Sequence, residues 1–413
     1  MQTQAIICEY NPFHNGHAYQ IQAGKKAAGS THTLALMSGS VVQRGTFAVA
    51  DKWLRARTAL LSGADLVCEL PFCYAAQSAE YFAAGAVKIL NATGVCDTLC
   101  FGSEAGDLEA LSHVAQSLAF ETPAFRDALK AALGQGLAFP KARELAFKAT
   151  EGEKSASYLR EPNNILGIEY LKALLRTHST IRPVTIKRQG NAYHDTNAQS
   201  RFASATAIRQ LLAAPGVSAL ALAPLLPYDP SLLLSYMQKA RIPWEESYAK
   251  ALLNQIHSQD LSRFRTLPYM EKGLEFKLKK ALEADSRYDS IVDTLTSKRA
   301  PKSRIRRILM DLSMGFESAD LSRFADPGFV PCLRVLGFNE KGRALLKAIR
   351  EQDGLPVITN TRANITRLSP DQRACFDFDA RATDLFSLFC EKQYHYHRDY
   401  TQNPVIIAEK EAL

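Results

Sequence analysis

The sequence lacks any run approaching the roughly 18 consecutive apolar residues that a membrane-spanning helix needs. Its first residues show no basic stretch followed by a long apolar core, so we expect no secretory leader. The eight cysteines are scattered, without a Cys-x-x-Cys pair or a histidine at zinc-site spacing. These absences exclude a disulfide scaffold and a zinc ribbon. They predict reduced thiols in a cytoplasmic protein with no membrane segment and no metal site.

Internal repeats and low-complexity tracts are missing as well, which excludes a solenoid and a disordered chain. The 413 residues are 46% apolar and 22% charged, the composition of a globular protein with a sizeable core. Fifty Lys and Arg against 42 Asp and Glu give a formal net charge of +8. This excess of basic residues favours a polyanionic partner, although it does not indicate a fold.

Short apolar runs of strand length alternate with helical segments through the first hundred residues. Most of these runs end at Gly or Pro, which are turn-forming residues. Such alternation predicts an α/β fold with a parallel sheet and helices on both faces. The expected strands are 4–10, 32–39, 64–72 and 96–104, followed after a mostly helical stretch by 182–190.

The second half of the chain has a different pattern. Three prolines within 222–234 mark a domain boundary. Beyond them the chain is helical and basic to about residue 325, and a further strand is expected at 355–360. We therefore predict an α/β domain at 1–225 and a mainly helical, basic domain at 226–413.

The stretch NPFHNGH places two histidines, His14 and His17, around Gly16, between the first strand and a helix. Phosphates bind in open α/β sheets at this kind of place, where a strand ends and the N–H groups of a helix N-terminus are free. Gly16 has no Cβ and so allows close backbone approach. An isolated pair of histidines is more typical of a turn or a core. The strand, the Asn-Pro turn and the glycine together favour two donors to phosphoryl oxygens.

A second anion-binding pattern, SATAIR, occupies residues 204–209. Ser204 is expected to cap a helix, and the hydroxyls of Ser204 and Thr206 can hold an anion there. Arg209 can reach a phosphate with its forked donors. By itself this pattern favours a capped amphipathic helix with an exposed arginine, so its meaning depends on the histidine motif.

Basic residues are concentrated in the segment SKRAPKSRIRR, residues 297–307, which contains no acid. The next helix carries an apolar stripe, which leaves the basic side chains free to follow a nucleic-acid backbone. A solvated basic face is the alternative, and the basic balance of the whole chain favours RNA. The residues concerned are Lys298, Arg299, Lys302, Arg304, Arg306 and Arg307.

Two other charged or polar pairs carry weaker predictions. Lys52 and Arg55 lie three residues apart on one face of a predicted helix, where they either hold phosphates or RNA or form a solvated face. His395 and His397 lie two apart near the C-terminus. Further metal ligands are missing around them, so we expect an exposed polar segment.

The histidine–glycine motif and the later SxTxxR pattern together resemble the nucleotidyltransferase superfamily, whose members attack the α-phosphate of ATP and release pyrophosphate. Further motifs narrow the resemblance to the tRNA(Met) cytidine acetate ligase family over nearly the whole chain. They are EYNPFHNGH, MSGSVVQRGTFAVADKW, GADLVCELPF, FGSE, PNNILGIEYLKAL, IKRQGNAYHD, ASATAIR, RVLGFNEKG and ATDLFSL. The resemblance implies a Rossmann-like nucleotidyltransferase fold followed by a tRNA-binding domain.

The resemblance also implies a set of site residues by position. We assign the catalytic roles to His14, His17 and Arg209. The implied ATP contacts include Gly102, Asn163 and Arg188, to which we add Ser204 and Thr206. The implied ATP-binding segment consists of Ile7, Cys8, Glu9, Tyr10, Asn11, Pro12, Phe13, His14, Asn15, Gly16, His17, Ala18, Tyr19 and Gln20.

The implied reaction joins acetate to ATP as acetyl-adenylate, and then acetylates the wobble cytidine of elongator tRNA(Met). An acetate carboxylate is nucleophilic at neutral pH, so the enzyme needs positioning and charge stabilisation and no covalent intermediate. Triphosphate chemistry favours an accompanying Mg²⁺. Two alternatives share the motifs: a small-molecule adenylyltransferase, and a nucleotide-sensing RNA-binding protein without turnover. The basic segment and the long region after SATAIR favour the tRNA ligase.

Overall fold

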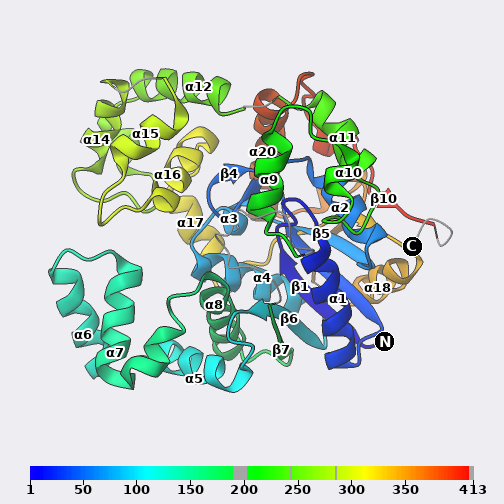
Figure 1. Cartoon of the computed structure of the whole chain (residues 1–413), viewed down its shortest axis with the longest axis horizontal. Coiled ribbons are helices and arrows are strands. Elements are labelled where there is room, and N and C mark those ends of the chain that lie inside the picture. Colours follow the sequence, from blue (N-terminus) through cyan, green and yellow to red (C-terminus); the bar gives the residue numbers. More distant parts are fainter. Residues whose placement is uncertain (189–201, 242–243, 284–285, 353, 409–413) are drawn as a thin grey trace.

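The computed structural model describes residues 1–188, 202–241, 244–283, 286–352 and 354–408 (Figure 1). Residues 189–190 of the strand expected at 182–190 lie outside this part of the chain. The strands of the main sheet are β1 (Thr3–Cys8), β2 (His32–Ser38), β5 (Leu66–Leu70), β6 (Thr98–Ser103), β7 (Arg182–Lys187), β8 (Leu333–Phe338), β9 (Val357–Ile358) and β10 (Val405–Ile406). A small hairpin is formed by β3 (Val41–Val42) and β4 (Thr46–Phe47).

Helices make up most of the remaining described residues. Those before residue 226 are α1 (Asn15–Ala28), α2 (Lys52–Leu61), α3 (Phe72–Ala75), α4 (Ala79–Thr93), α5 (Leu108–Ala119), α6 (Pro123–Gly134), α7 (Phe139–Ser157), α8 (Pro162–Arg176), α9 (Ala205–Ala213) and α10 (Ala219–Leu222). Those after it are α11 (Pro230–Lys239), α12 (Glu245–Ser258), α13 (Leu261–Arg265), α14 (Leu274–Lys280), α15 (Tyr288–Leu295), α16 (Lys302–Met314), α17 (Ser318–Ala325), α18 (Glu340–Arg350), α19 (Thr361–Asn364), α20 (Pro370–Cys390) and α21 (Arg398–Thr401).

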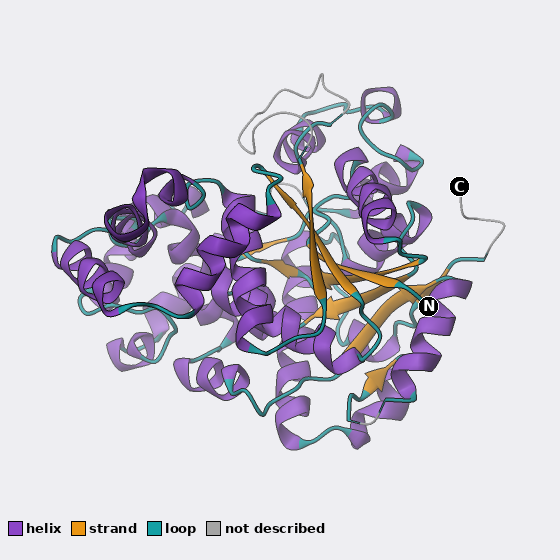
Figure 2. Ribbon diagram, turned by 90° about the horizontal axis from the view of Figure 1, so that it is seen from below, coloured by secondary structure: helices purple, strands orange, loops and turns teal. Residues whose placement is uncertain are grey.

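The main sheet has the strand order β10-β8-β5-β2-β1-β6-β7, with β9 beside β8. Strands β5, β2, β1, β6 and β7 are parallel, and helices pack on both faces of the sheet (Figure 2). All six residues of β1 are buried, as expected for a central strand covered on both sides. The predicted Rossmann-like sheet is therefore confirmed. Its order reverses between β1 and β6, and such a reversal opens a ligand-binding crevice at the carboxyl ends of the strands.

The sheet also contains strands that the apolar pattern did not predict. β8 pairs antiparallel with β5, and β10 pairs with β8, so the second half of the chain completes the sheet of the first half. The run Leu333–Phe338 includes Arg334, a charged residue that breaks an apolar run, yet this residue is buried and ion-paired. The domain boundary at residue 225 stays a prediction. Strands from 1–225 and from 226–413 lie in the same sheet.

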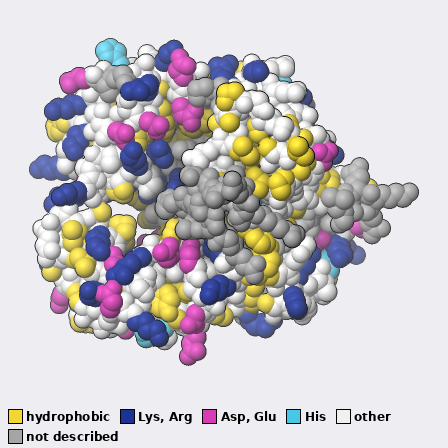
Figure 3. Space-filling model, in the orientation of Figure 1, with side chains coloured by type: hydrophobic (Ala, Val, Ile, Leu, Met, Phe, Trp, Pro, Cys, Tyr) yellow, Lys and Arg dark blue, Asp and Glu magenta, His cyan; other side chains and the backbone are white. Residues whose placement is uncertain are grey.

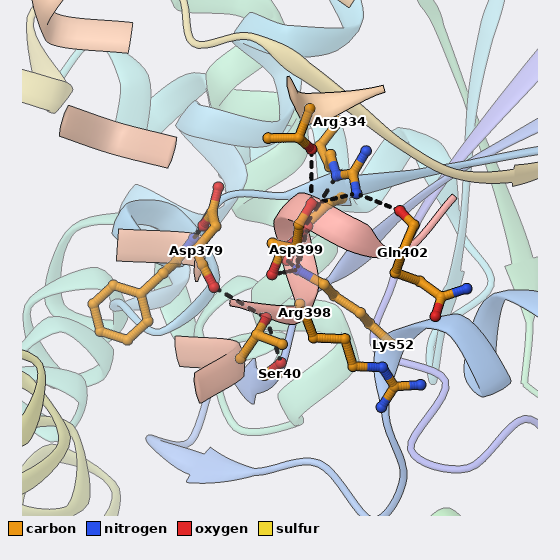
Figure 4. Close-up of polar contacts among 12 residues, drawn as sticks. Ser40, Lys52, Arg334, Asp379, Arg398, Asp399 and Gln402 are labelled. Atoms are coloured by element: carbon orange, nitrogen blue, oxygen red, sulfur yellow. Dashed lines mark hydrogen bonds and ion pairs between the residues drawn. The ribbon is translucent and has the colours of Figure 1, made fainter. Parts of the chain in front are cut away.

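Lys52 and Arg55 are buried, so the prediction that they hold phosphates or RNA, or lie on a solvated face, is wrong. The Lys52 ammonium lies 2.8 Å from Glu69 and 2.9 Å from Asp399, and its side chain is 0% exposed (Figure 4). Arg55 donates to the carbonyls of Glu9 (2.7 Å) and Ser38 (3.0 Å). Helix α2 packs against β5, β8 and β10, so its charged groups can be accommodated only by pairing.

The ion pairs of Lys52 also involve residues from the C-terminal part of the chain. Asp399 belongs to α21, and it also lies 3.6 Å from the Arg334 side chain in β8. Figure 4 shows Lys52, Arg334 and Asp399 converging, with Asp379 of α20 close by. The buried charges therefore join the C-terminal helices to the end of β5, where Glu69 lies.

Candidate nucleotide site

The loop between β1 and α1 arranges the two motif histidines through a reciprocal cap. The Gly16 N–H donates to Nδ1 of His14 (3.1 Å), and the His14 N–H donates to Nδ1 of His17 (3.2 Å). Their rings stack with centroids 3.7 Å apart. Since each Nδ1 accepts a hydrogen bond, each neutral ring carries its proton on Nε2. The loop therefore presents two Nε2–H donors at the start of α1.

Both histidines are held in the neutral form. Burial, followed by the charges of Arg188 and Arg209, lowers the pKa of His14 to about 3. Burial, His14 and Arg188 lower the pKa of His17 well below its ordinary value. At neutral pH the histidines therefore supply hydrogen bonds without charge, and positive charge comes from the arginines.

Gly16 is required by the position of the His14 ring. A Cβ at this position would meet Cε1 of His14 at 2.9 Å and Nδ1 at 3.0 Å, closer than carbon atoms pack. This differs from the sequence-based reason, which was close approach of a nucleotide to the backbone.

We expect Gly16→Ala to displace the His14 ring and to lower the site's catalytic rate by about 10-fold or more, since misplacement by 1 Å can cost this much. Gly134→Ala is the matched control, because a Cβ at this position in α6 would meet nothing within 4 Å. We expect the control to keep full activity and to be stabilised by up to about 1 kcal/mol. Full activity of Gly16→Ala would show that the ring position is not needed.

The start of α9 brings SATAIR to the same loop. The Ser204 hydroxyl accepts from the Ala207 N–H (3.1 Å), which confirms the predicted N-cap. Arg209 donates to the carbonyl of Asn11 (2.7 Å) and to the Thr206 hydroxyl (3.1 Å). The guanidinium is thus fixed between α9 and the histidine loop.

The histidine loop and the start of α9 form two walls of the crevice. The third wall comes from the ends of β6 and β7. Arg188 donates to the Asn163 side-chain oxygen (3.4 Å), and Asn163 donates to Glu104 (2.5 Å). A Cβ on Gly102 would lie 3.3 Å from Cγ of Arg188, so the glycine leaves room for the arginine side chain beside β6. The predicted contacts Gly102, Asn163 and Arg188 therefore lie together, beside the reversal between β1 and β6.

One cavity of about 720 Å³ connects these walls. Of the predicted site residues it is lined by Ile7, Cys8, Glu9, Tyr10, Asn11, His14, His17, Gln20, Gly102, Asn163, Arg188, Ser204, Thr206, Arg209 and Arg306. The other residues predicted in the 7–20 segment lie outside its lining: Phe13 is in the core, the Asn15 side chain donates to the Pro224 carbonyl, and Tyr19 packs on Phe202. Pro12, Gly16 and Ala18 also lie outside the lining.

The basic segment divides into exposed and engaged residues. Lys298, Arg299 and Lys302 are exposed, and Lys302 pairs with Asp293 (2.5 Å). Arg304, Arg306 and Arg307 are half-buried and already have partners within the protein, so they are less free than the sequence suggested, and their contact with nucleic acid stays a prediction. Arg304 donates to the Tyr269 carbonyl and to Glu271, Arg306 donates to Asp289, and Arg307 lies over the Tyr269 ring.

The far end of the cavity was not predicted from the sequence. The β3–β4 hairpin contributes Thr46 and Phe47, and the helices α12 and α15 contribute residues near Trp244 and Tyr288. No local pattern marks these residues, because only the packing of distant helices brings them together.

The described residues contain no group of three or more His, Cys, Asp or Glu placed to hold a metal ion. His395 and His397 lie in an exposed segment, as the sequence predicted. Among the described residues, no helix has the length and apolar character needed to cross a membrane.

Comparison with known proteins places this geometry in a family. Residues 1–402 match the family model described as HIGH Nucleotidyl Transferase. The tRNA(Met) cytidine acetate ligase of Caldanaerobacter subterraneus subsp. tengcongensis is 40% identical, with 94% of this chain and 95% of that protein covered. That of Acetivibrio thermocellus is 37% identical, with 98% and 100% covered.

Solved structures agree with the sequence relatives. The crystal structure of Thermotoga maritima TmcAL in its apo form is 33% identical and covers 99% of this chain and 100% of that one, with a TM-score of 0.91. A second form of that protein, bound with alpha-thio ATP, gives a TM-score of 0.88 at 31% identity. The match covers 99% of this chain and 100% of that one. The chain therefore belongs to the tRNA(Met) cytidine acetate ligase family of HIGH nucleotidyl transferases, as its motifs predicted.

Proposed function

We propose that this protein is an ATP-dependent ligase that acetylates the exocyclic amine of the wobble cytidine in elongator tRNA(Met). The observation that carries the proposal is the pair of neutral histidines in a crevice that also contains Arg188 and Arg209; in the described part of the chain neither Nε2 has a hydrogen-bond partner. Its family relatives are named for this reaction, and one solved relative binds alpha-thio ATP.

The first step joins acetate to the nucleotide. A carboxylate oxygen of acetate attacks the α-phosphorus of ATP, and the bond to the bridging oxygen breaks, so that pyrophosphate leaves. His14 and His17 donate Nε2–H bonds to phosphoryl oxygens, and Arg188 and Arg209 balance the negative charge. We expect Mg²⁺ to accompany ATP as a ligand of its phosphate oxygens.

The second step transfers the acetyl group. The cytidine N4 attacks the acetyl carbonyl carbon, the carbon–oxygen bond to AMP breaks, and the amine loses one proton. An anticodon loop presents its bases unpaired, so no duplex needs to open. A tRNA substrate also accounts for the basic charge of the chain and predicts a cytoplasmic protein.

We further propose that the exposed residues Lys298, Arg299 and Lys302 contact tRNA phosphates. Replacing Lys298 and Arg299 by Gln is expected to weaken tRNA binding and to reduce the salt slope of log Kd by about 2, one for each lost contact. Acetate-dependent pyrophosphate formation should not change. Replacing Lys250 of α12 and Lys130 of α6 by Gln serves as the control, since both lysines are exposed. An equal effect of both pairs would argue against a specific surface.

One assay separates the three candidate functions. The protein is incubated with ATP, acetate and unmodified tRNA(Met), pyrophosphate is followed, and the mass of the tRNA is measured. We expect acetate-dependent pyrophosphate and a mass gain of one acetyl group. Pyrophosphate formation that does not depend on acetate but requires another metabolite would identify a small-molecule adenylyltransferase. Binding of ATP and tRNA without turnover would identify a sensing protein.

A further inference from the structure

The cavity has two chemically different ends. One end, described above, is lined by the histidines and arginines around β1, β6 and α9. The other is lined by Phe47, Trp244, Glu245, Tyr288, Asp289 and Arg306, which come from β4, from the start of α12 and the residue before it, and from α15 and α16. Figure 3 shows a hollow between these helices and the body that contains the sheet, with basic and acidic side chains at its rim.

The far end is a fixed aromatic wall. The ring centroids of Phe47 and Trp244 lie 5.2 Å apart in an edge-to-face arrangement, and those of Trp244 and Tyr288 lie 5.9 Å apart. Tyr248 packs behind them at 5.5 Å from Tyr288. Because these rings support one another, Trp244 keeps a half-buried face toward the cavity without needing a ligand to order it.

Polar groups at this end are left without partners inside the protein. The Tyr288 residue is 4% exposed, and its hydroxyl has no hydrogen-bond partner among the residues that the structure describes. Nε of Arg306 is likewise buried and unbonded within the described chain, while its Nη2 lies 3.3 Å from Asp289. Buried polar groups are almost always satisfied, so unpaired ones that line a cavity point to a ligand.

We propose that this end is the subsite for the acceptor base, a flat pyrimidine that stacks on Trp244 and is read by Tyr288 and Arg306. This rests on the proposed function. A cytosine edge offers an amine that donates and two acceptors, N3 and O2. The carboxylates of Glu245 and Asp289 accept from the amine, and the Tyr288 hydroxyl and Arg306 donate to the acceptors. Stacking on aromatic rings is the usual way to hold an unpaired base.

The position of this end suits the second substrate. The motif histidines, Arg188 and Arg209 lie at the other end, and the nucleotide of a doubly wound fold binds at the strand-order reversal. Helix α16 also runs from the exposed Lys302 to Arg306 in the cavity, so basic charge leads from the surface inward. A tRNA backbone held outside would thus deliver a splayed base to the aromatic wall.

The test separates adenylation from transfer. Acetate-dependent exchange of pyrophosphate into ATP needs no tRNA, whereas acetylation of the tRNA needs both steps. We expect Tyr288→Phe to keep exchange within about two-fold and to lower kcat/KM for tRNA acetylation about 10-fold, the effect of one lost hydrogen bond to a ligand. Trp244→Leu should lower acetylation further and again spare exchange.

Two further variants keep the test decisive. Tyr74→Phe removes a buried hydroxyl bonded to the Phe324 carbonyl, far in sequence from the cavity, and should change both activities equally. Arg306→Gln carries the test if Tyr288→Phe fails to fold. If the far-end variants raise the KM for ATP in the exchange reaction, this end holds the adenosine. If they leave tRNA acetylation unchanged, it holds no substrate. Either result overturns the proposal. Wild-type protein without acetate-dependent exchange would instead refute the proposed function.

Discussion

Replacing His17 by alanine is expected to lower acetate-dependent pyrophosphate formation by about 10²- to 10³-fold, as does the loss of one preorganised donor at a reacting centre. The variant loses the Nε2–H donor and leaves the His14 N–H without its bond to Nδ1 of His17. Affinity for tRNA should stay within about two-fold of the wild type, because distant sites rarely couple. Exchange kinetics and filter binding measure the two quantities.

His17→Asn separates the two roles of the ring. The Asn side-chain oxygen can take the place of Nδ1 and accept from the backbone N–H of the cap residue, but the shorter side chain has no donor at the position of Nε2. We therefore expect normal thermal stability and the same loss of adenylation. His113→Ala is the matched control, since this histidine is exposed and pairs with Glu151 at 3.5 Å. Full activity of His17→Asn would show that the histidine serves only as a cap.

Lys52→Met should lower the free energy of unfolding by about 3–5 kcal/mol, the cost of removing one partner from a buried ion pair. Burial lowers the pKa of Lys52, but Asp399 and Glu69 outweigh it and raise this pKa above its ordinary value, so the ammonium stays charged. Without it, two buried carboxyl groups at the junction of β5 and α21 lose their shared cation. Urea denaturation measures the change.

Lys250→Met tests the same substitution in an exposed pair. Lys250 lies 3.2 Å from Glu246, and both side chains are more than 60% exposed. Such pairs contribute about 0–1 kcal/mol, so we expect a change within that range. A loss from Lys52→Met as small as that from the control would mean that the buried carboxyl groups become neutral at little cost.

The local motifs could be located from the sequence because their geometry is local. The cap between His14 and His17 spans one helical turn, and the Ser204 cap spans three residues. The parallel strands were also predictable, since their buried faces require continuous apolar runs. Strand β8 was missed because its run contains Arg334, a charge that only distant partners make tolerable in a core.

Charged residues on helices were the least predictable. Lys52 and Arg55 have a spacing typical of a solvated face, yet both are buried against strands. Three arginines of the basic segment, among them Arg304, have partners within the protein, in α15 and in the segment before α14. The position of a buried charge depends on its partners, and the carboxylate partners of Lys52 lie 17 and 347 positions away along the chain.

Short spacings and the burial of apolar runs were enough to predict the fold class and the family from residue order alone, and they also indicated the residues proposed to meet a nucleotide. Which charged residues are buried, and where the second end of the cavity lies, depends on how distant elements pack together. Trp244 immediately precedes α12, Tyr288 begins α15 and Arg306 lies in α16, and their shared position follows from helix packing, which no local spacing encodes.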